Sequence, residues 1–181
     1  SFDDPERGIH LVLVNVNGRL AADGRNISAE IQASVTDRDR RQLVGDLDTT
    51  VQLRLDSQQR LARAQWHIQT SELLLAELVR QLPRHPLVPI AGRLNAEVWG
   101  EWQAGKPQEM QGLLDLRDAE LSSQTGPMNI DHLNSRFNFQ FTARKNWRFD
   151  MSGLVVEYAG EEWQSARFSV ARNIPQDLGL W

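Results

Sequence analysis

The stretch SRFNFQFTARKNWRFDM, residues 135–151, alternates between large apolar and polar side chains in two consecutive runs. Successive side chains of a β-strand point to opposite faces, so alternate residues share one face. A short polar turn separates the two runs, and the pattern therefore predicts two neighbouring strands. Six large apolar side chains would lie on one face of this pair: Phe137, Phe139, Phe141, Trp147, Phe149 and Met151.

The same period of two recurs along most of the chain, as expected for a protein made mainly of strands. Together with 135–151, the alternating stretches predict about nine strands. They include residues 9–16, 26–35, 51–55, 62–69, 93–102, 110–121 and 163–170.

Two glycine-containing dipeptides are candidates for the turn of the first hairpin. Asp23-Gly24 is a strong signal for a two-residue turn, because both turn positions favour φ > 0. Asn17-Gly18 is a rival turn or a bulge inside a longer strand. A bulge there would move the following side chains to the opposite face.

Residues 71–83 form the one clear helix candidate. Ser71 is a suitable N-cap, Glu72 suits the positive end of the helix dipole, and Pro83 ends the pattern. One apolar stripe would let this helix brace the sheet: Leu74, Leu75, Leu78, Val79 and Leu82. At the start of the chain, residues 1–7 are expected to form a flexible end.

Composition and motifs exclude several function classes. A formal net charge of −4 argues against nucleic-acid binding, which needs a clustered basic face. The four histidines are scattered without metal-ligand spacing, and there is no cysteine, nucleophile elbow or phosphate-binding glycine loop. We therefore expect no enzyme activity, no metal and no cofactor.

One helix is too little to cover about nine one-sided strands. The apolar face must be offered to a ligand, packed on a second sheet, or closed on itself. These outcomes correspond to an open groove, to a β-sandwich structural or interaction module, and to a soluble lipocalin-like barrel. The alternation alone leaves all three open.

Three blocks of sequence resemble one family, and their order along the chain also resembles the order in that family. AEVWGEWQAG (96–105), ARAQWHIQTSELLLAELV (62–79) and NWRFDMSGLVVEYAGEEWQSARFSV (146–170) are similar to the YhdP branch of the AsmA-like proteins of Gram-negative bacteria. The resemblance covers roughly residues 8–172. It departs from the family at Gln164, where a proline commonly follows the last tryptophan.

The resemblance implies a long β-groove lined with apolar residues, as in TamB and the other bridge-like lipid carriers. It implies a periplasmic segment of an inner-membrane-anchored protein that moves phospholipids toward the outer membrane and maintains the outer-membrane barrier. The implied partners are phospholipid acyl chains, adjacent groove repeats and the membrane anchor of the same chain, and envelope docking proteins. The family offers no catalytic residues to carry over.

We therefore predict an all-β fold: a highly twisted, mainly antiparallel sheet curled into a groove, with one short amphipathic α-helix. Residues 1–181 are expected to be a single groove segment of a longer protein. The side chains predicted to contact lipid are Ile27, Ile31, Val35, Val51, Leu53, Leu55, Val98, Phe137, Phe139, Phe141, Trp147, Phe149, Met151, Phe168 and Val170.

Overall fold

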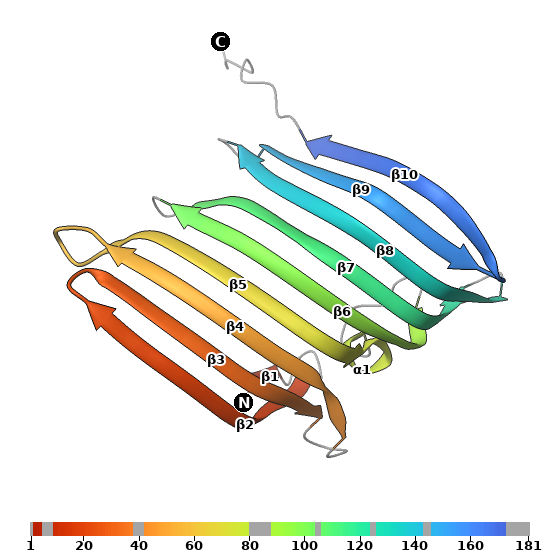
Figure 1. Ribbon diagram of the computed structural model, residues 1–181, viewed down its shortest axis with the longest axis horizontal. Helices are drawn as coiled ribbons and strands as arrows, with labels where there is room; N and C mark the ends of the chain where they lie inside the picture. Colours follow the sequence, from red (N-terminus) through yellow and green to blue (C-terminus); the bar gives the residue numbers. More distant parts are fainter. Residues whose placement is uncertain are drawn as a thin grey trace, which may run out of the picture.

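The computed structural model describes residues 2–4, 9–37, 42–79, 88–103, 106–123, 126–142 and 146–172. Ten strands form one antiparallel sheet in which the spatial order equals the sequence order (Figure 1). The strands are β1 (Phe2–Asp4), β2 (Ile9–Asp23), β3 (Asn26–Asp37), β4 (Leu43–Leu55), β5 (Leu61–Leu74), β6 (Val88–Gln103), β7 (Lys106–Ser123), β8 (Gly126–Thr142), β9 (Asn146–Tyr158) and β10 (Glu161–Arg172).

The sheet does not close, and the main contacts between described elements join neighbouring strands. The predicted all-β curled sheet is therefore confirmed, and the described chain forms neither a β-sandwich nor a closed barrel by itself. The strand count is ten because β1 pairs with the start of β2, Phe2 lying opposite Leu11. The expected flexible end, residues 1–7, thus includes a short paired strand at residues 2–4, and residues 1 and 5–7 lie outside the described part.

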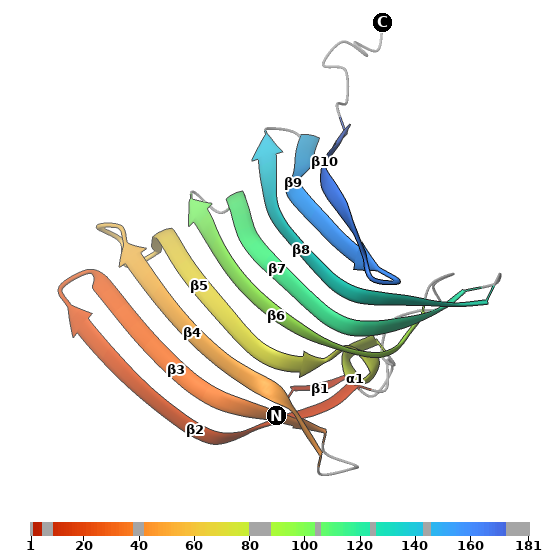
Figure 2. The ribbon, with the colours of Figure 1, turned by 45° about the vertical axis from the view of Figure 1, so that its right-hand side comes forward.

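The long strands bend partway along their length, so that the sheet is curved (Figure 2). Residues with positive φ interrupt several of the strands at the bend: Asn15 in β2, Glu72 in β5, Gly92 in β6, Asp118 in β7 and Gly153 in β9. Shifts in the strand register accompany them. A bulge adds a residue to one strand of a pair and bends it, so this series of irregularities explains the curvature.

The small buried core lies at this bend. Val44 is fully buried and packs with Val35 and Leu73. Partly buried leucines surround this cluster: Leu11, Leu47, Leu74 and Leu94. Away from the bend, most large apolar side chains of the sheet are only half-buried or exposed.

The predicted helix is much shorter than 71–83. Residues 71–74 belong to β5, and α1 comprises only Leu75–Val79. The leucine spacing fits both structures, because a bulge at Glu72 shifts the alternation and brings Leu73 opposite Leu94. Pairing with β6 then extends the strand where the sequence predicts a helix. Leu82 and the side chains of Leu78 and Val79 lie outside the described part.

The first hairpin turn is displaced by one residue from its predicted place. Asp23 pairs with Asn26, so the turn residues are Gly24 and Arg25, and only Gly24 has a positive φ, of 58°. Glycine at the first turn position is typical of a type II′ turn. The rival site is a bulge rather than a turn, and it centres on Asn15, just before Asn17.

Candidate functional site: a continuous apolar face

The strand register places the predicted lipid-contacting residues on one face. Around Phe139, Met110 lies directly opposite on β7 and Phe149 on β9. Directly opposed residues of an antiparallel pair point to the same side of the sheet. Followed from strand to strand, this gives a central row across β3 to β10: Ala29, Val51, Trp66, Gly100, Met110, Phe139, Phe149 and Val170.

Two further rows flank the central row on the same face. One contains Ile31, Thr49, Ile68, Val98, Gly112, Phe137, Met151 and Phe168. The other contains Ile27, Leu53, Ala64, Trp102 and Pro107, and continues with the pair Phe141–Trp147. Leu55 follows Leu53 by two residues at the end of β4. We call these three rows the apolar face.

Val35 is the exception among the predicted residues. Its side chain is 8% exposed, covered by Val44 and Leu73 in the core at the bend. The prediction that Val35 lines an open surface is therefore wrong, because the bend folds other side chains over it. The remaining predicted residues share the face, and their contact with lipid stays a prediction.

The apolar face lies on the inner side of the bend. There, Ala33 and Ser135 point to this face and are 7% and 0% exposed. Their sequence neighbours on the other face, Gln32 and Arg136, are exposed. Side chains on the inside of a curved sheet crowd together, whereas those on the outside spread apart, so the exposures identify the apolar face as concave.

An aromatic cluster occupies this face on β8 and β9. The ring of Phe139 lies 4.5 Å from Phe141, 5.7 Å from Trp147 and 6.4 Å from Phe149, measured between centroids. The rings stay partly open to solvent, since Phe141 is 40% exposed and Phe168, two strands away, is 54% exposed. No described element packs over this part of the sheet, because α1 contacts only β5 and β6 among the main contacts.

Glycines allow aromatic rings to lie flat against the sheet. A Cβ atom added to Gly100 would lie 2.1 Å from Cζ2 of Trp66, and one added to Gly112 would lie 2.7 Å from Cε1 of Phe137. Both positions therefore require the absence of a side chain. The rings of Trp66 and Phe137 cover the glycine backbone and make this part of the face continuously apolar.

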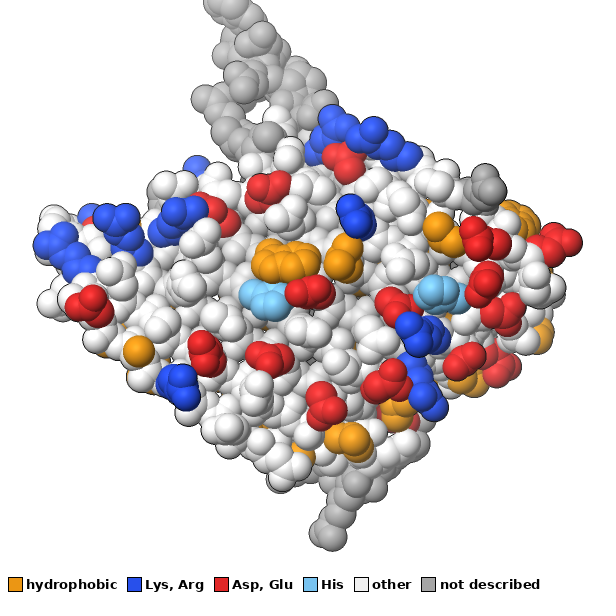
Figure 3. All heavy atoms as spheres, in the orientation of Figure 1, with side chains coloured by type: hydrophobic (Ala, Val, Ile, Leu, Met, Phe, Trp, Pro, Cys, Tyr) orange, Lys and Arg blue, Asp and Glu red, His pale blue; other side chains and the backbone are white. Residues whose placement is uncertain are grey.

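The opposite face is polar and is held by cross-strand hydrogen bonds and ion pairs (Figure 3). The amide of Asn138 on β8 donates to Glu109 on β7 over 2.6 Å, and Arg63 Nη2 on β5 lies 2.8 Å from Glu101 on β6. Within β9, Arg148 Nε lies 2.6 Å from Asp150. The guanidinium of Arg148, helped by the hydroxyl of Ser169, lowers the pKa of Asp150 to about 2. Such solvated pairs suit a surface that faces water, in contrast to the face behind it.

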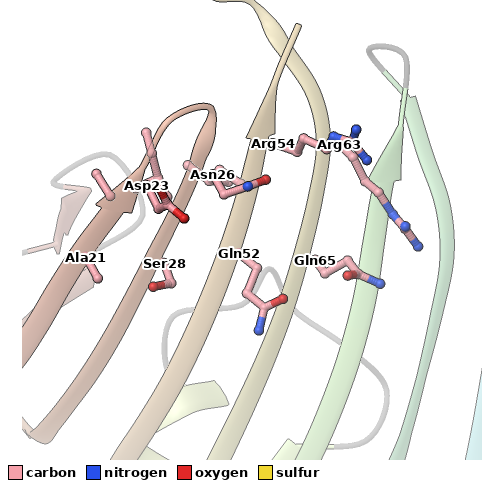
Figure 4. A pocket seen from close by; sticks show the side chains of 11 residues that line it. Ala21, Asp23, Asn26, Ser28, Gln52, Arg54, Arg63 and Gln65 are labelled. Atoms are coloured by element: carbon pink, nitrogen blue, oxygen red, sulfur yellow. The ribbon is translucent and has the colours of Figure 1, made fainter.

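Hollows defined by side chains lie mainly on the polar face. One, with a volume of about 300 Å³, lies beside the turns that join β2 to β3 and β4 to β5 (Figure 4). Its polar lining includes Asn26, Gln52, Arg54, Arg63 and Gln65. The apolar face is an open curved surface.

Two histidines of the polar face have carboxylate partners. His67 Nε2 lies 2.9 Å from Glu97 and its ring stacks on Trp99, while His132 Nε2 lies 2.8 Å from Asp115. Within the described ranges, no group of three histidine or acidic side chains could hold a metal ion. In the same part of the chain, no helix has the length and apolar character needed to cross a bilayer.

Sequence reasoning missed several residues of the apolar face, notably Trp66, Ile68, Trp102 and Met110. Alternation from Val98 places Trp102 on the face, and alternation through Gly112 places Met110 there. The signal was therefore present for these two. For Trp66 and Ile68, alternation with polar sequence neighbours such as Gln65 gives the same signal, but more weakly.

Comparison of the chain with protein-family models, with curated proteins and with solved structures gives no match. The resemblance to the YhdP branch of the AsmA-like proteins therefore stays a prediction. What the chain can do is argued below from its own geometry.

Proposed function

We propose that this chain is one segment of a bridge-like lipid carrier, which conducts phospholipids along the apolar face. The observation that carries the proposal is the continuous apolar surface from β3 to β10, on the inner side of a single-layered sheet that no other described element covers. Exposed apolar patches of this extent on a protein surface indicate a binding site.

The energetics of the cargo fit such a surface. A two-tailed phospholipid has on the order of 30 methylene groups, so moving it through water costs about 25 kcal/mol at roughly 0.8 kcal/mol for each group. A curved apolar face with water-facing polar side chains behind it removes much of this cost without any chemical step. The large, partly exposed rings of Phe141 and Phe168 are available for contact with acyl chains.

Transport also requires that the cargo be released at each step. The apolar face presents many similar weak contacts in rows, so an acyl chain would gain little by stopping at any one place. At a strand spacing of about 4.8 Å, the nine strands β2 to β10 extend roughly 40 Å along the rows. This length suits one stretch of a longer path.

The cellular setting of the proposal comes from the family resemblance. On the basis of this resemblance we propose that the segment lies in the periplasm of a Gram-negative bacterium, as part of an inner-membrane-anchored protein that supports the outer-membrane barrier. Adjacent groove repeats of the same chain and envelope docking proteins are the partners in this setting.

An interaction module is the second candidate. The exposed apolar rings would also be covered if another protein sheet packed on the concave face, which would complete a two-layered sandwich. Trp163 on β10 is 63% exposed, and the outer edge of β10 has no partner strand among the described residues, as expected for a surface that another protein covers. The two candidates differ in what occupies the face: lipid tails or protein.

Mass spectrometry of lipids that co-purify with the chain under native conditions tests the proposal. Phe139→Asp places a carboxylate at the centre of the apolar face, and Gln111→Asp places the same charge on the polar face of the neighbouring strand. If the carboxylate excludes about four methylene groups, lipid affinity falls by about 3 kcal/mol, or roughly a hundredfold.

The expected result is bound phospholipid in the unaltered chain and in Gln111→Asp, and its loss in Phe139→Asp, with circular dichroism showing all three folded. Phe139 is partly open to water, so its replacement need not unfold the sheet. Absence of lipid from the unaltered chain, with a dimer that Phe139→Asp dissociates, would support the interaction module and refute lipid transport.

A further inference from the structure

A shallow polar trough crosses the outer side of the bend. Two hollows lie there, one of about 380 Å³ over β2 to β5 and one of about 430 Å³ over β5 to β8. Gln69 and Ser71 of β5 line both hollows, so the two are parts of one trough. The trough runs across the strands on the polar face, opposite the apolar face.

Short hydrogen-bonding side chains form most of the trough. Its lining consists mainly of asparagine, glutamine, serine, aspartate and glutamate side chains from the strands that it crosses. Figure 3 shows the middle of this face covered largely by uncharged polar and acidic side chains. An amide group has both donors and an acceptor, and a hydroxyl group likewise donates and accepts. The trough therefore offers donors and acceptors side by side along its length.

Some of these amides have no partner inside the protein. Gln69 and Asn134 are exposed, and neither forms a hydrogen bond with another described residue. The same holds for Asn17 on β2. The three amides lie at the two ends and near the middle of the trough. Hydrogen-bonding groups are therefore available to a ligand along the whole trough.

The carboxylates of the trough, in contrast, already have partners. They belong to Asp46, Asp48, Glu97 and Asp115. Each lies 2.8 to 2.9 Å from a donor of a neighbouring side chain. Arg136 is the one cationic side chain among the described lining residues, so the lining disfavours a polyanion. Because the carboxylates are already paired, the free binding capacity is that of the uncharged amides.

An apolar surface borders the β5–β8 half of the trough. Leu113 lines this half and is 38% exposed. Trp99 lies diagonal to it on the same face, since Trp99 pairs with Gln111, two residues before Leu113. Sugar rings have apolar C–H faces as well as hydroxyl groups. They are therefore suited to a surface where an aromatic or aliphatic side chain adjoins hydrogen-bonding groups.

The spacing of the strands also suits a sugar chain. Neighbouring strands lie about 4.8 Å apart, which is close to the length of one ring in an extended β-linked glycan. The strands β2 to β8 span roughly 30 Å, so the trough has room for about six rings. Each ring of such a chain would meet the side chains of a new strand.

We propose that the trough on the outer side of the bend binds an uncharged, extended glycan, and that the amides of Gln69 and Asn134 bind its hydroxyl groups. This inference goes beyond the proposed function and does not depend on it, because the trough and the apolar face lie on opposite sides of the sheet. A glycan bound there would leave the apolar face free.

Calorimetric titration of the chain with cellohexaose tests the inference. Maltohexaose is the control ligand, because it has the same composition but an α-linked chain that coils instead of extending across the strands. The double variant Gln69→Ala/Asn134→Ala removes two amides from the trough. Gln52→Ala/Gln111→Ala is its matched control, because it removes two exposed amides of the same face that do not line the trough.

The unaltered chain and the Gln52→Ala/Gln111→Ala variant should bind cellohexaose, and both should bind maltohexaose less tightly. Gln69→Ala/Asn134→Ala should weaken cellohexaose binding by about fivefold for each amide removed. All four amides are exposed, so circular dichroism should show every variant folded.

Absence of cellohexaose binding by the unaltered chain would overturn the inference. So would equal binding of the two hexasaccharides, or equal weakening by the two double variants, because the binding would then not depend on the trough. Binding of hexalysine and not of cellohexaose would assign the trough to a basic peptide instead. None of these results bears on lipid binding at the apolar face, so the failure of this inference is distinguishable from failure of the proposed function.

Discussion

Replacing a small buried residue should destabilise this protein more than replacing a large aromatic one. Val44 is 0% exposed and packs between Val35 and Leu73 at the bend. Val44→Ala removes the equivalent of two methylene groups and leaves a cavity in a site with no access to water. The expected loss of unfolding free energy is about 2–3 kcal/mol.

Phe168 provides the contrast. Its ring lies on the apolar face of β10 and is 54% exposed, so half of its surface is already in water. Phe168→Ala removes many more atoms than Val44→Ala, yet the burial lost is worth only about 1 kcal/mol. The order of the two effects is therefore opposite to the order of side-chain size.

Urea unfolding of both variants, followed by circular dichroism, measures the two losses. We expect a clearly lower midpoint for Val44→Ala than for Phe168→Ala, with similar slopes. If Phe168→Ala costs as much as Val44→Ala, the apolar face is covered by another layer in solution. The face would then be a core, and the reasoning that leads to a lipid-accessible surface would fail.

Two further predictions concern single positions. Hydrogen bonds from Arg148 on the same strand and from Ser169 on β10 lower the pKa of Asp150 from 3.8 to about 2. The stabilisation that the Asp150 carboxylate contributes to the folded sheet is therefore complete above 3.8 and is lost as the pH falls through 2. Carboxyl NMR should show this midpoint, and titration at the ordinary value would contradict the ion pair. Gly100→Ala should displace the ring of Trp66 and cost about 1–3 kcal/mol in thermal unfolding. Gly18→Ala, where the nearest atom is the backbone oxygen of Glu30 at 3.3 Å, is the comparison and should cost less than Gly100→Ala.

Alternation was sufficient to predict the fold class and most of the apolar face. In β8 no irregularity separates Phe137, Phe139 and Phe141, and their partners follow one another in unbroken register. Each hydrophobic side chain there has a polar neighbour, so a strand has only one way to bury its apolar side. The sequence alone therefore places these residues together.

The bend could not be predicted in the same way. At Glu72 a single extra residue changes which side chains share a face, and nothing in the alternation marks it. The leucines that follow were consequently assigned to a helix. Val35 alternates like Ile31, and only the curvature of the sheet decides that one is buried and the other 37% exposed. Curvature arises from the pairing of several strands, so it cannot be predicted from the alternation within one strand.

The direct opposition of Arg54 on β4 and Arg63 on β5 shows a further limit of prediction from the sequence. Each arginine is an ordinary polar position within its own strand, and their opposition arises from the register between β4 and β5. That register depends on the length of the intervening turn, Asp56–Arg60, whose backbone hydrogen bond joins Asp56 N to Arg60 O over 2.8 Å. The opposition of these two like charges is thus visible only once the strands are paired.

The spatial order of the strands, which repeats their order along the chain, has a consequence for how such a molecule is made and how it changes. Every strand meets its partners as soon as the next hairpin has been synthesised, so none must wait for a distant part of the polypeptide. Ordered structure can then grow from one end, at low cost in loop closure. Duplication or loss of one hairpin would lengthen or shorten the ribbon and leave every other pairing intact, so evolution can adjust its span in steps of two strands.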